Sequence, residues 1–147
     1  MERKDRINYY LDIAETVTER STCIRRQWGA VIVKNDEIVS TGYNGNCRGE
    51  PHCLTCTKVK INKDEAEYLT CKSVHAEMNA IISASRNEML GATLYLAGYI
   101  TSTGEENLNV EPCEICLRLI KNAGIDKVVT SNGVIYQRDS QGILRRN

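Results

Sequence analysis

The sequence predicts an α/β fold, a three-layer α/β/α sandwich around a mixed sheet. Between Asp5 and Arg20, apolar residues recur three or four positions apart, which is the pattern of an amphipathic helix. Two short apolar runs joined by a turn at Lys34–Asp36 follow, and they indicate a β-hairpin. Helix and strand patterns then alternate, which predicts βαβ crossovers with helices on both faces of the sheet.

The elements are expected in the order helix, strand, strand, helix, strand, helix, strand, with one more short strand at the end. The expected helices span residues 5–20, 75–86 and 113–122, and the expected strands span residues 30–33, 37–41, 93–97, 127–130 and 134–137. Ser73 is the expected cap of the middle helix, whereas Pro112 opens the last helix and Gly124 ends it. Gly42 to Lys72 is an expected loop of about thirty residues, and loops of that length are usually functional or held in place.

The composition is that of one globular domain, expected over residues 1–147. The 147 residues include 19 basic and 19 acidic side chains, and the apolar share of 41% excludes collagen-like, coiled-coil and disordered chains. No apolar run approaches the roughly 20 residues of a membrane span, and the charged start from Met1 to Arg6 is unlike a signal peptide. We therefore expect a cytoplasmic protein without a membrane or nucleic-acid partner, because a net charge near zero disfavours polyanion binding.

Seven cysteines are the most informative feature of the composition. In a reducing cytosol this density indicates metal ligation or redox chemistry before disulfides, and the odd number excludes a complete set of intramolecular bridges.

Two short motifs stand at two predicted helix starts. They are His75-Ala76-Glu77 and Pro112-Cys113-Glu114-Ile115-Cys116. One imidazole and two thiolates leave the fourth position of a tetrahedral zinc ion open for water, whose pKa zinc lowers to about 7. Glu77 lies two residues from the ligand His75 and is placed to take a proton from this water molecule and transfer it to the substrate. A lone C-x-x-C is also found in redox and structural zinc sites, but the two motifs together are typical of zinc-dependent nucleobase deaminases.

The sequence resembles the deoxycytidylate (dCMP) deaminase family, which has the cytidine deaminase fold. The resemblance rests on Ser21–Cys23, Gly29–Val33, Gly42–Gly45, His75–Ile81, Pro112–Cys116 and Asn122–Ile125. It implies hydrolytic deamination of dCMP to dUMP and ammonia, with a catalytic zinc on His75, Cys113 and Cys116. It also implies that Glu77 protonates N3 of cytosine and later the departing amine.

The resemblance further implies substrate contacts. Asn44 would hold the sugar hydroxyl and the Ala76 backbone would lie near the base, although Tyr-Asn-Gly is also a good turn sequence. Arg86 is the candidate phosphate contact. On a continuous helix it lies roughly 20° from the face of His75 and about 16 Å along the axis, a reach that suits the site of a neighbouring subunit. The family forms oligomers, often hexamers. A solvated arginine at the helix end is the equal alternative, and Arg25 and Arg26 are weaker candidates.

Some members of the family carry a second, structural zinc. By that likeness its ligands here would be Cys23, Cys53, Cys56 and Cys71, with Cys47 and His52 in reserve. Free thiols are the alternative. Some members are also regulated by dCTP and dTTP through a loop that Gly42–Gly45 resembles.

Two features depart from the family. Gly98–Val110 lengthens the segment before Pro-Cys, and Glu111 replaces a common serine, where a carboxylate facing the pocket would repel a phosphate. The rival functions are deamination of cytidine, cytosine, guanine, a pterin-like base or tRNA adenosine, and a noncatalytic zinc-stabilised binding module. The balanced charge disfavours a tRNA enzyme, and a noncatalytic module requires Glu77 to be incidental.

Overall fold

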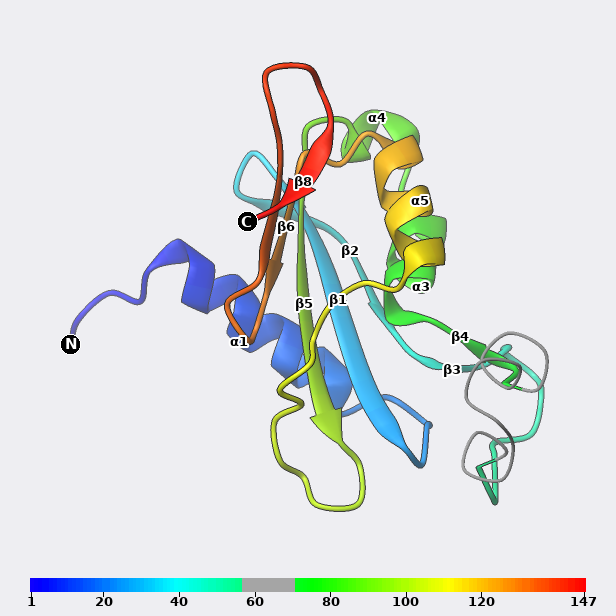
Figure 1. Ribbon diagram of the computed structural model, residues 1–147. Helices are drawn as coiled ribbons and strands as arrows, with labels where there is room; N and C mark the ends of the chain where they lie inside the picture. The colour runs from blue at the N-terminus through cyan, green and yellow to red at the C-terminus, as the bar shows by residue number, and fades with distance from the viewer. Residues whose placement is uncertain (57–70) are drawn as a thin grey trace.

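The fold was determined as a computed structural model that describes residues 1–56 and 71–147. Its centre is a six-stranded sheet in the order β2-β1-β5-β6-β7-β8 (Figure 1). Parallel pairing joins β5 to β6, and the other neighbouring strands run antiparallel, so the predicted mixed sheet is confirmed. The strands of this sheet are β1 (Arg26–Lys34), β2 (Glu37–Tyr43), β5 (Thr93–Ile100), β6 (Lys127–Thr130), β7 (Ile135–Arg138) and β8 (Leu144–Arg146).

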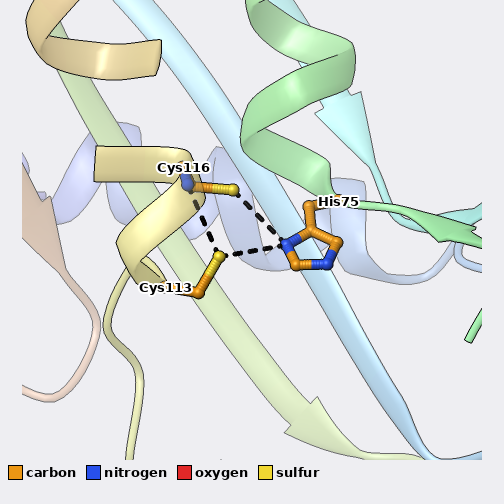
Figure 2. Close-up of side chains that lie close together, drawn as sticks. All are labelled: His75, Cys113 and Cys116. Carbon is orange, nitrogen blue, oxygen red and sulfur yellow. Dashed lines mark hydrogen bonds between the residues drawn. The ribbon is translucent and has the colours of Figure 1, made fainter. Parts of the chain in front are cut away.

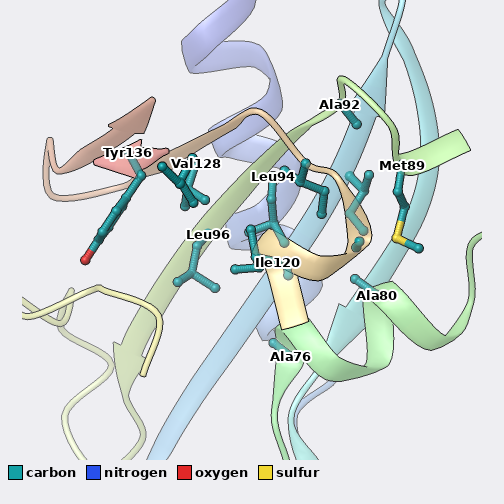
Figure 3. Close-up of a cluster of buried hydrophobic side chains, with 14 of the residues drawn as sticks. Ala76, Ala80, Met89, Ala92, Leu94, Leu96, Ile120, Val128 and Tyr136 are labelled. Carbon is teal, nitrogen blue, oxygen red and sulfur yellow. The ribbon is translucent and has the colours of Figure 1, made fainter. Parts of the chain in front are cut away.

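Helices cover both faces of this sheet. Helix α1 (Arg6–Thr18) lies on one face, and α3 (Ala76–Ile82), α4 (Arg86–Met89) and α5 (Glu114–Ala123) lie on the other (Figure 1). The alternation of β1 explains the two cores: Val31 packs with α1, whereas Ala30 and Ile32 pack with α3 and α5. Leu94 and Ile120 belong to the core that contains Ala30 and Ile32 (Figure 3). The predicted three-layer sandwich is confirmed.

Two hydrogen bonds from side chains to backbone carbonyl oxygens join strand β2 to helix α3. Ser40 Oγ donates to the Ala80 carbonyl oxygen at 2.7 Å, and Asn79 Nδ2 donates to the Tyr43 carbonyl oxygen at 2.8 Å. Gly42 lies between these two contacts and leaves room for the helix backbone to approach the strand. The start of α3 is therefore fixed relative to the sheet.

The predicted continuous helix at 75–86 is wrong. Helix α3 ends at Ile82, and a separate helix α4 begins at Arg86. Ser85 caps α4: its Oγ accepts from the Glu88 amide, and the Glu88 carboxylate accepts from the Ser85 amide. Ser73 is not the cap of α3, because it lies in the short strand β4 (Ser73–Val74) and His75 occupies the N-cap position.

The expected loop at 42–72 is partly regular. Strand β2 continues to Tyr43, and β3 (Gly45–Asn46) pairs with β4. In the stretch 98–110, β5 extends to Ile100 and a bridge between Tyr99 and Glu106 turns the chain back along it. Strand β8 was not predicted, and β1 begins four residues earlier than expected. Within residues 1–56 and 71–147, no helix combines the length and apolar character that a membrane span requires.

Candidate metal centre and active site

Three potential metal ligands meet where α3 and α5 begin. His75 is the N-cap residue of α3, Cys113 is the N-cap residue of α5, and Cys116 lies in the first turn of α5. Nδ1 of His75 lies 3.5 Å from Cys113 Sγ and 3.4 Å from Cys116 Sγ (Figure 2). Among the described residues, this is the one group of three or more His, Cys, Asp or Glu side chains whose ligand atoms converge in this way.

These distances fit one tetrahedral zinc ion. Zn–S bonds of about 2.3 Å and Zn–N bonds of about 2.0–2.1 Å at the tetrahedral angle place sulfur and nitrogen ligands about 3.6 Å apart. The two measured separations, 3.4 and 3.5 Å, are close to that value. One nitrogen and two sulfurs leave a fourth position for water or substrate, as in catalytic rather than structural zinc sites.

The fold explains why these residues meet. Helix α3 packs on β1 and β2, and α5 connects β5 to the parallel neighbour β6, so the two helices lie together on one face of the sheet. Their N-terminal ends come together, as the close-up shows (Figure 2). Gly124 ends α5 in the left-handed conformation at φ 86°, as the sequence predicted.

The thiols are polarised by their neighbours. The hydrogen bond from Cys116, with contributions from His75 and the Cys116 amide, lowers the pKa of the Cys113 thiol to about 4 against the opposing effect of burial. The same hydrogen bond, together with burial, raises the pKa of the Cys116 thiol. A bound cation would favour the deprotonated form of both thiols.

Glu77 is buried beside these ligands. Only 4% of the residue is exposed, and burial raises the pKa of its carboxyl group, while the backbone amide of Glu77 and then the charge of His75 act in the opposite direction. A buried carboxyl group with a raised pKa is suited to accept and return a proton.

Asn44 is buried, and its side chain makes three hydrogen bonds within the fold. Its Oδ1 accepts from Ser21 Oγ at 2.5 Å and from the Trp28 amide at 2.8 Å, and its Nδ2 donates to the Arg26 carbonyl oxygen at 2.9 Å. Sequence reasoning missed these partners, which join the end of β2 to β1 and to the segment that precedes it. Ala76 is completely buried, and its carbonyl oxygen faces Gly42.

Arg86 does not lie on the same helix as His75, contrary to the prediction from the sequence. It is exposed and occupies the first position of α4, beyond the break at Ser83–Ser85. The helical periodicity that placed it on the face of His75 therefore does not apply.

The cysteines expected to bind a second metal do not converge in the described part of the chain. Cys23, Cys53, Cys56 and Cys71 form no second ligand group among residues 1–56 and 71–147. Cys23 Sγ accepts from the amides of Arg25 and Arg26, each at 3.5 Å. Cys47 and His52, the two reserves, line a cavity of about 480 Å³ beside β2.

The Glu111 carboxylate is paired with two side chains of the sheet. Its Oε1 accepts from Tyr136 Oη at 2.9 Å and from Arg146 Nε at 2.6 Å. These bonds, first that from Arg146, lower the pKa of the Glu111 carboxyl group. The expected repulsion of a phosphate applied only if Glu111 were free to face the pocket. Local sequence carried no signal for this pairing, because both partners lie at least 25 residues away.

The chain is similar to known deaminases. The sequence profile of the cytidine and deoxycytidylate deaminase zinc-binding region matches residues 4–132. The deoxycytidylate deaminase of Mycobacterium phage D29 is 38% identical over 135 residues, covering 88% of this chain and 96% of that protein. The deoxycytidylate deaminase of Saccharomyces cerevisiae is 31% identical over 140 residues, covering 94% of this chain but 41% of the yeast protein.

A solved structure extends this similarity to three dimensions. The dCMP deaminase of cyanophage S-TIM5, in complex with dCMP and dUMP, is 26% identical to this chain with a TM-score of 0.62. The match covers 88% of this chain and 83% of the phage protein. The predicted cytidine deaminase-like fold is thereby confirmed.

Proposed function

The chain belongs to the cytidine and deoxycytidylate deaminase zinc-binding family, and we propose that it hydrolyses dCMP to dUMP and ammonia. The observation that carries this proposal is the convergence of His75, Cys113 and Cys116 beside the buried carboxyl group of Glu77. The similar phage protein that was solved with dCMP and dUMP supports a nucleotide as substrate.

His75, Cys113 and Cys116 would hold the zinc ion. When bound, zinc supplies Lewis acidity that makes a water molecule nucleophilic at neutral pH. Glu77 accepts a proton from the attacking water and passes it to N3 of cytosine as C4 is attacked. It then takes the second proton from the new C4 hydroxyl and delivers it to the departing amine, so that the C4 carbonyl forms as ammonia leaves. Water and dCMP thus become dUMP and ammonia. Asn44 is proposed to orient the sugar hydroxyl, and the buried Ala76 backbone to line the base site.

A substrate panel tests this function. Ammonia release would be measured with dCMP, CMP, deoxycytidine and guanine. We expect turnover of dCMP, and loss of that turnover in Glu77→Gln, which keeps the shape of the side chain but cannot carry the proton. Glu114→Gln is the matched control, because Glu114 is exposed in the first turn of the neighbouring helix α5. Equal turnover of dCMP and deoxycytidine would contradict recognition of the phosphate, and an active Glu77→Gln would contradict the proton transfer.

We also propose a second, structural zinc on Cys23, Cys53, Cys56 and Cys71. The residue types support it, because four cysteines are a complete tetrahedral ligand set for a structural zinc ion, and two amides already donate to Cys23 Sγ. All seven cysteines are unpaired, which suits a reducing compartment such as the cytoplasm. Metal analysis should find two zinc ions per chain in the purified protein and one in Cys23→Ser. One zinc in both proteins would contradict this ligand set.

Finally, we propose a homo-oligomer, such as a hexamer, in which Arg86 contacts the substrate phosphate in a neighbouring subunit. The exposed position of Arg86 at the start of α4 leaves it accessible to another chain. Light scattering should give a mass above that of one chain. Mixing the Glu77→Gln and Arg86→Ala variants should give more activity at low dCMP than the sum of the two alone, because mixed oligomers contain intact shared sites. A monomer, or an Arg86→Ala variant with unchanged KM for dCMP, would contradict the proposal.

A further inference from the structure

The segment before Cys113 is held from the far edge of the sheet. Tyr136 of β7 and Arg146 of β8 are direct partners across an antiparallel pair, so their side chains leave the same face. Both donate to one carboxylate oxygen, Oε1 of Glu111. Tyr136 is 7% exposed and belongs to the core beneath α3 and α5. The register of the β7–β8 pair therefore aims two donors at a single point.

That point is two residues from a metal ligand. Pro112, which is buried and has a restricted φ, is the residue between Glu111 and Cys113. The chain on the other side is fixed as well: the Leu108 carbonyl oxygen accepts from Asn132 Nδ2 at 2.9 Å, and Val110 is completely buried. Within residues 1–56 and 71–147, the bonds to Glu111 are consequently the last side-chain anchors before the ligand, and a shift of Glu111 would pass through Pro112, a stiff residue, to Cys113.

We propose that Tyr136 and Arg146 are positioning residues for the metal centre, acting through Glu111. By holding the Glu111 carboxylate, they fix the segment that presents Cys113 to His75 and Cys116. This inference rests on the proposed metal site and adds three residues outside it that determine how firmly the metal is held.

Zinc release from the purified holoenzyme tests the proposal. Transfer of zinc to 4-(2-pyridylazo)resorcinol would be followed by absorbance, in parallel with the loss of activity that identifies the catalytic ion. Loss of groups that orient metal ligands typically costs 10–100-fold in metal affinity, and these residues act one step further out, so we expect Arg146→Met and Glu111→Gln to release that ion about tenfold faster. Tyr136→Phe should have a smaller effect in the same direction, and Arg146→Lys should restore part of the retention.

Arg145→Met is the matched control. Arg145 lies in the same strand and its Nε pairs with Asp139 at 2.6 Å, so its loss removes an equivalent ion pair that does not touch the Glu111 segment. We expect wild-type zinc retention in Arg145→Met. Glu111→Gln combined with Arg146→Met should release zinc no faster than the stronger single variant, because both changes remove the same contact.

Steady-state kinetics separate positioning from general stability. For Arg146→Met and Glu111→Gln we expect a lower kcat and a nearly unchanged KM for dCMP. The measurement is made at a temperature where circular dichroism shows every variant to be folded. Equal zinc release from Arg146→Met and Arg145→Met would overturn the proposal, as would additive effects of Glu111→Gln and Arg146→Met. A wild-type protein purified without zinc would instead contradict the metal site itself, so the two failures are distinguishable.

Discussion

Gly42 of β2 and Ala76 of α3 approach so closely that a Cβ atom on Gly42 would lie 2.3 Å from the Ala76 carbonyl oxygen. The same atom would lie 2.4 Å from the Ala80 amide nitrogen, so both near neighbours are backbone and cannot rotate away. Ala76 is flanked by His75 and Glu77. The absence of a side chain at position 42 thus determines where a metal ligand and the proposed proton carrier stand.

Gly42→Ala should therefore displace α3 and weaken the metal centre. Overpacking of this kind typically costs about 1–3 kcal/mol, and we expect the upper end because the clash is with backbone. Urea denaturation would give the loss in free energy of unfolding, and metal analysis the loss of zinc. Thr41→Ala, at the neighbouring exposed position of β2, is the control and should change neither quantity. A Gly42→Ala protein with wild-type stability and zinc content would contradict the close packing.

The break between α3 and α4 makes a second prediction. Ser85→Ala removes the side chain that caps α4, and loss of such a cap costs about 1 kcal/mol. Thermal and urea unfolding would measure the difference. Asn87→Ala, a change at an exposed position of the same helix, should have a smaller effect on stability. If the two variants were equally stable, the capping box would not be what starts α4.

The sequence allowed the metal centre to be predicted because its ligands lie in short local motifs. His75 is the N-cap residue of α3, and Glu77 follows it two residues later. Cys113 is the N-cap residue of α5, and Cys116 follows it three residues later. The α/β class followed from periodicities that also act locally. The start of α4 could also have been predicted, because Ser85 and Glu88 have the spacing of a capping box. The apolar periodicity across 75–86 instead favoured one continuous helix.

Contacts between distant elements could not be predicted in this way. The partners of Asn44 come from residues 16–23 positions away, and they depend on how β1 and β2 pair. Glu111 meets Arg146 because of the register between β7 and β8, and β8 is too short to show a pattern of its own. A residue whose role depends on register, as that of Glu111 does here, cannot be recognised from its neighbours along the chain.

Metal removal makes a third prediction. Dialysis against a chelator should abolish deamination, and added zinc should restore it, because the three ligands and not a fixed covalent group supply the reactive centre. Cys113→Ser should lose the catalytic zinc and at least about a hundredfold in activity, given that metal-assisted water activation lowers a pKa from 15.7 to about 7. Cys47→Ser, at an exposed position outside the ligand group, is the matched control. Full activity in the chelated protein would contradict the metal site.

Tyr10 makes a fourth prediction, a loss of stability at alkaline pH. Its hydroxyl donates to Asp36 Oδ1 at 2.6 Å, and burial, followed by this hydrogen bond, raises the pKa of Tyr10 to about 12. In the unfolded chain the pKa of tyrosine is about 10. Between these two values the unfolded state has lost the proton that the folded state keeps, so the free energy of unfolding falls as the pH rises from about 10 to about 12. The stabilisation is complete below pH 10.

Urea unfolding of Tyr10→Phe at a series of pH values measures this contribution. At pH 7.5 the variant should be less stable by about 0.5–1.5 kcal/mol, the usual net value of a hydrogen bond. Above pH 10 its stability should decline less steeply than that of the wild type. Some decline should remain, because burial also raises the pKa of Tyr99 to about 12. Tyr9→Phe, which alters the exposed neighbour of Tyr10 on α1, should keep the wild-type slope. Parallel pH profiles for the wild type and Tyr10→Phe would show that the Tyr10 phenol keeps its ordinary pKa in the fold.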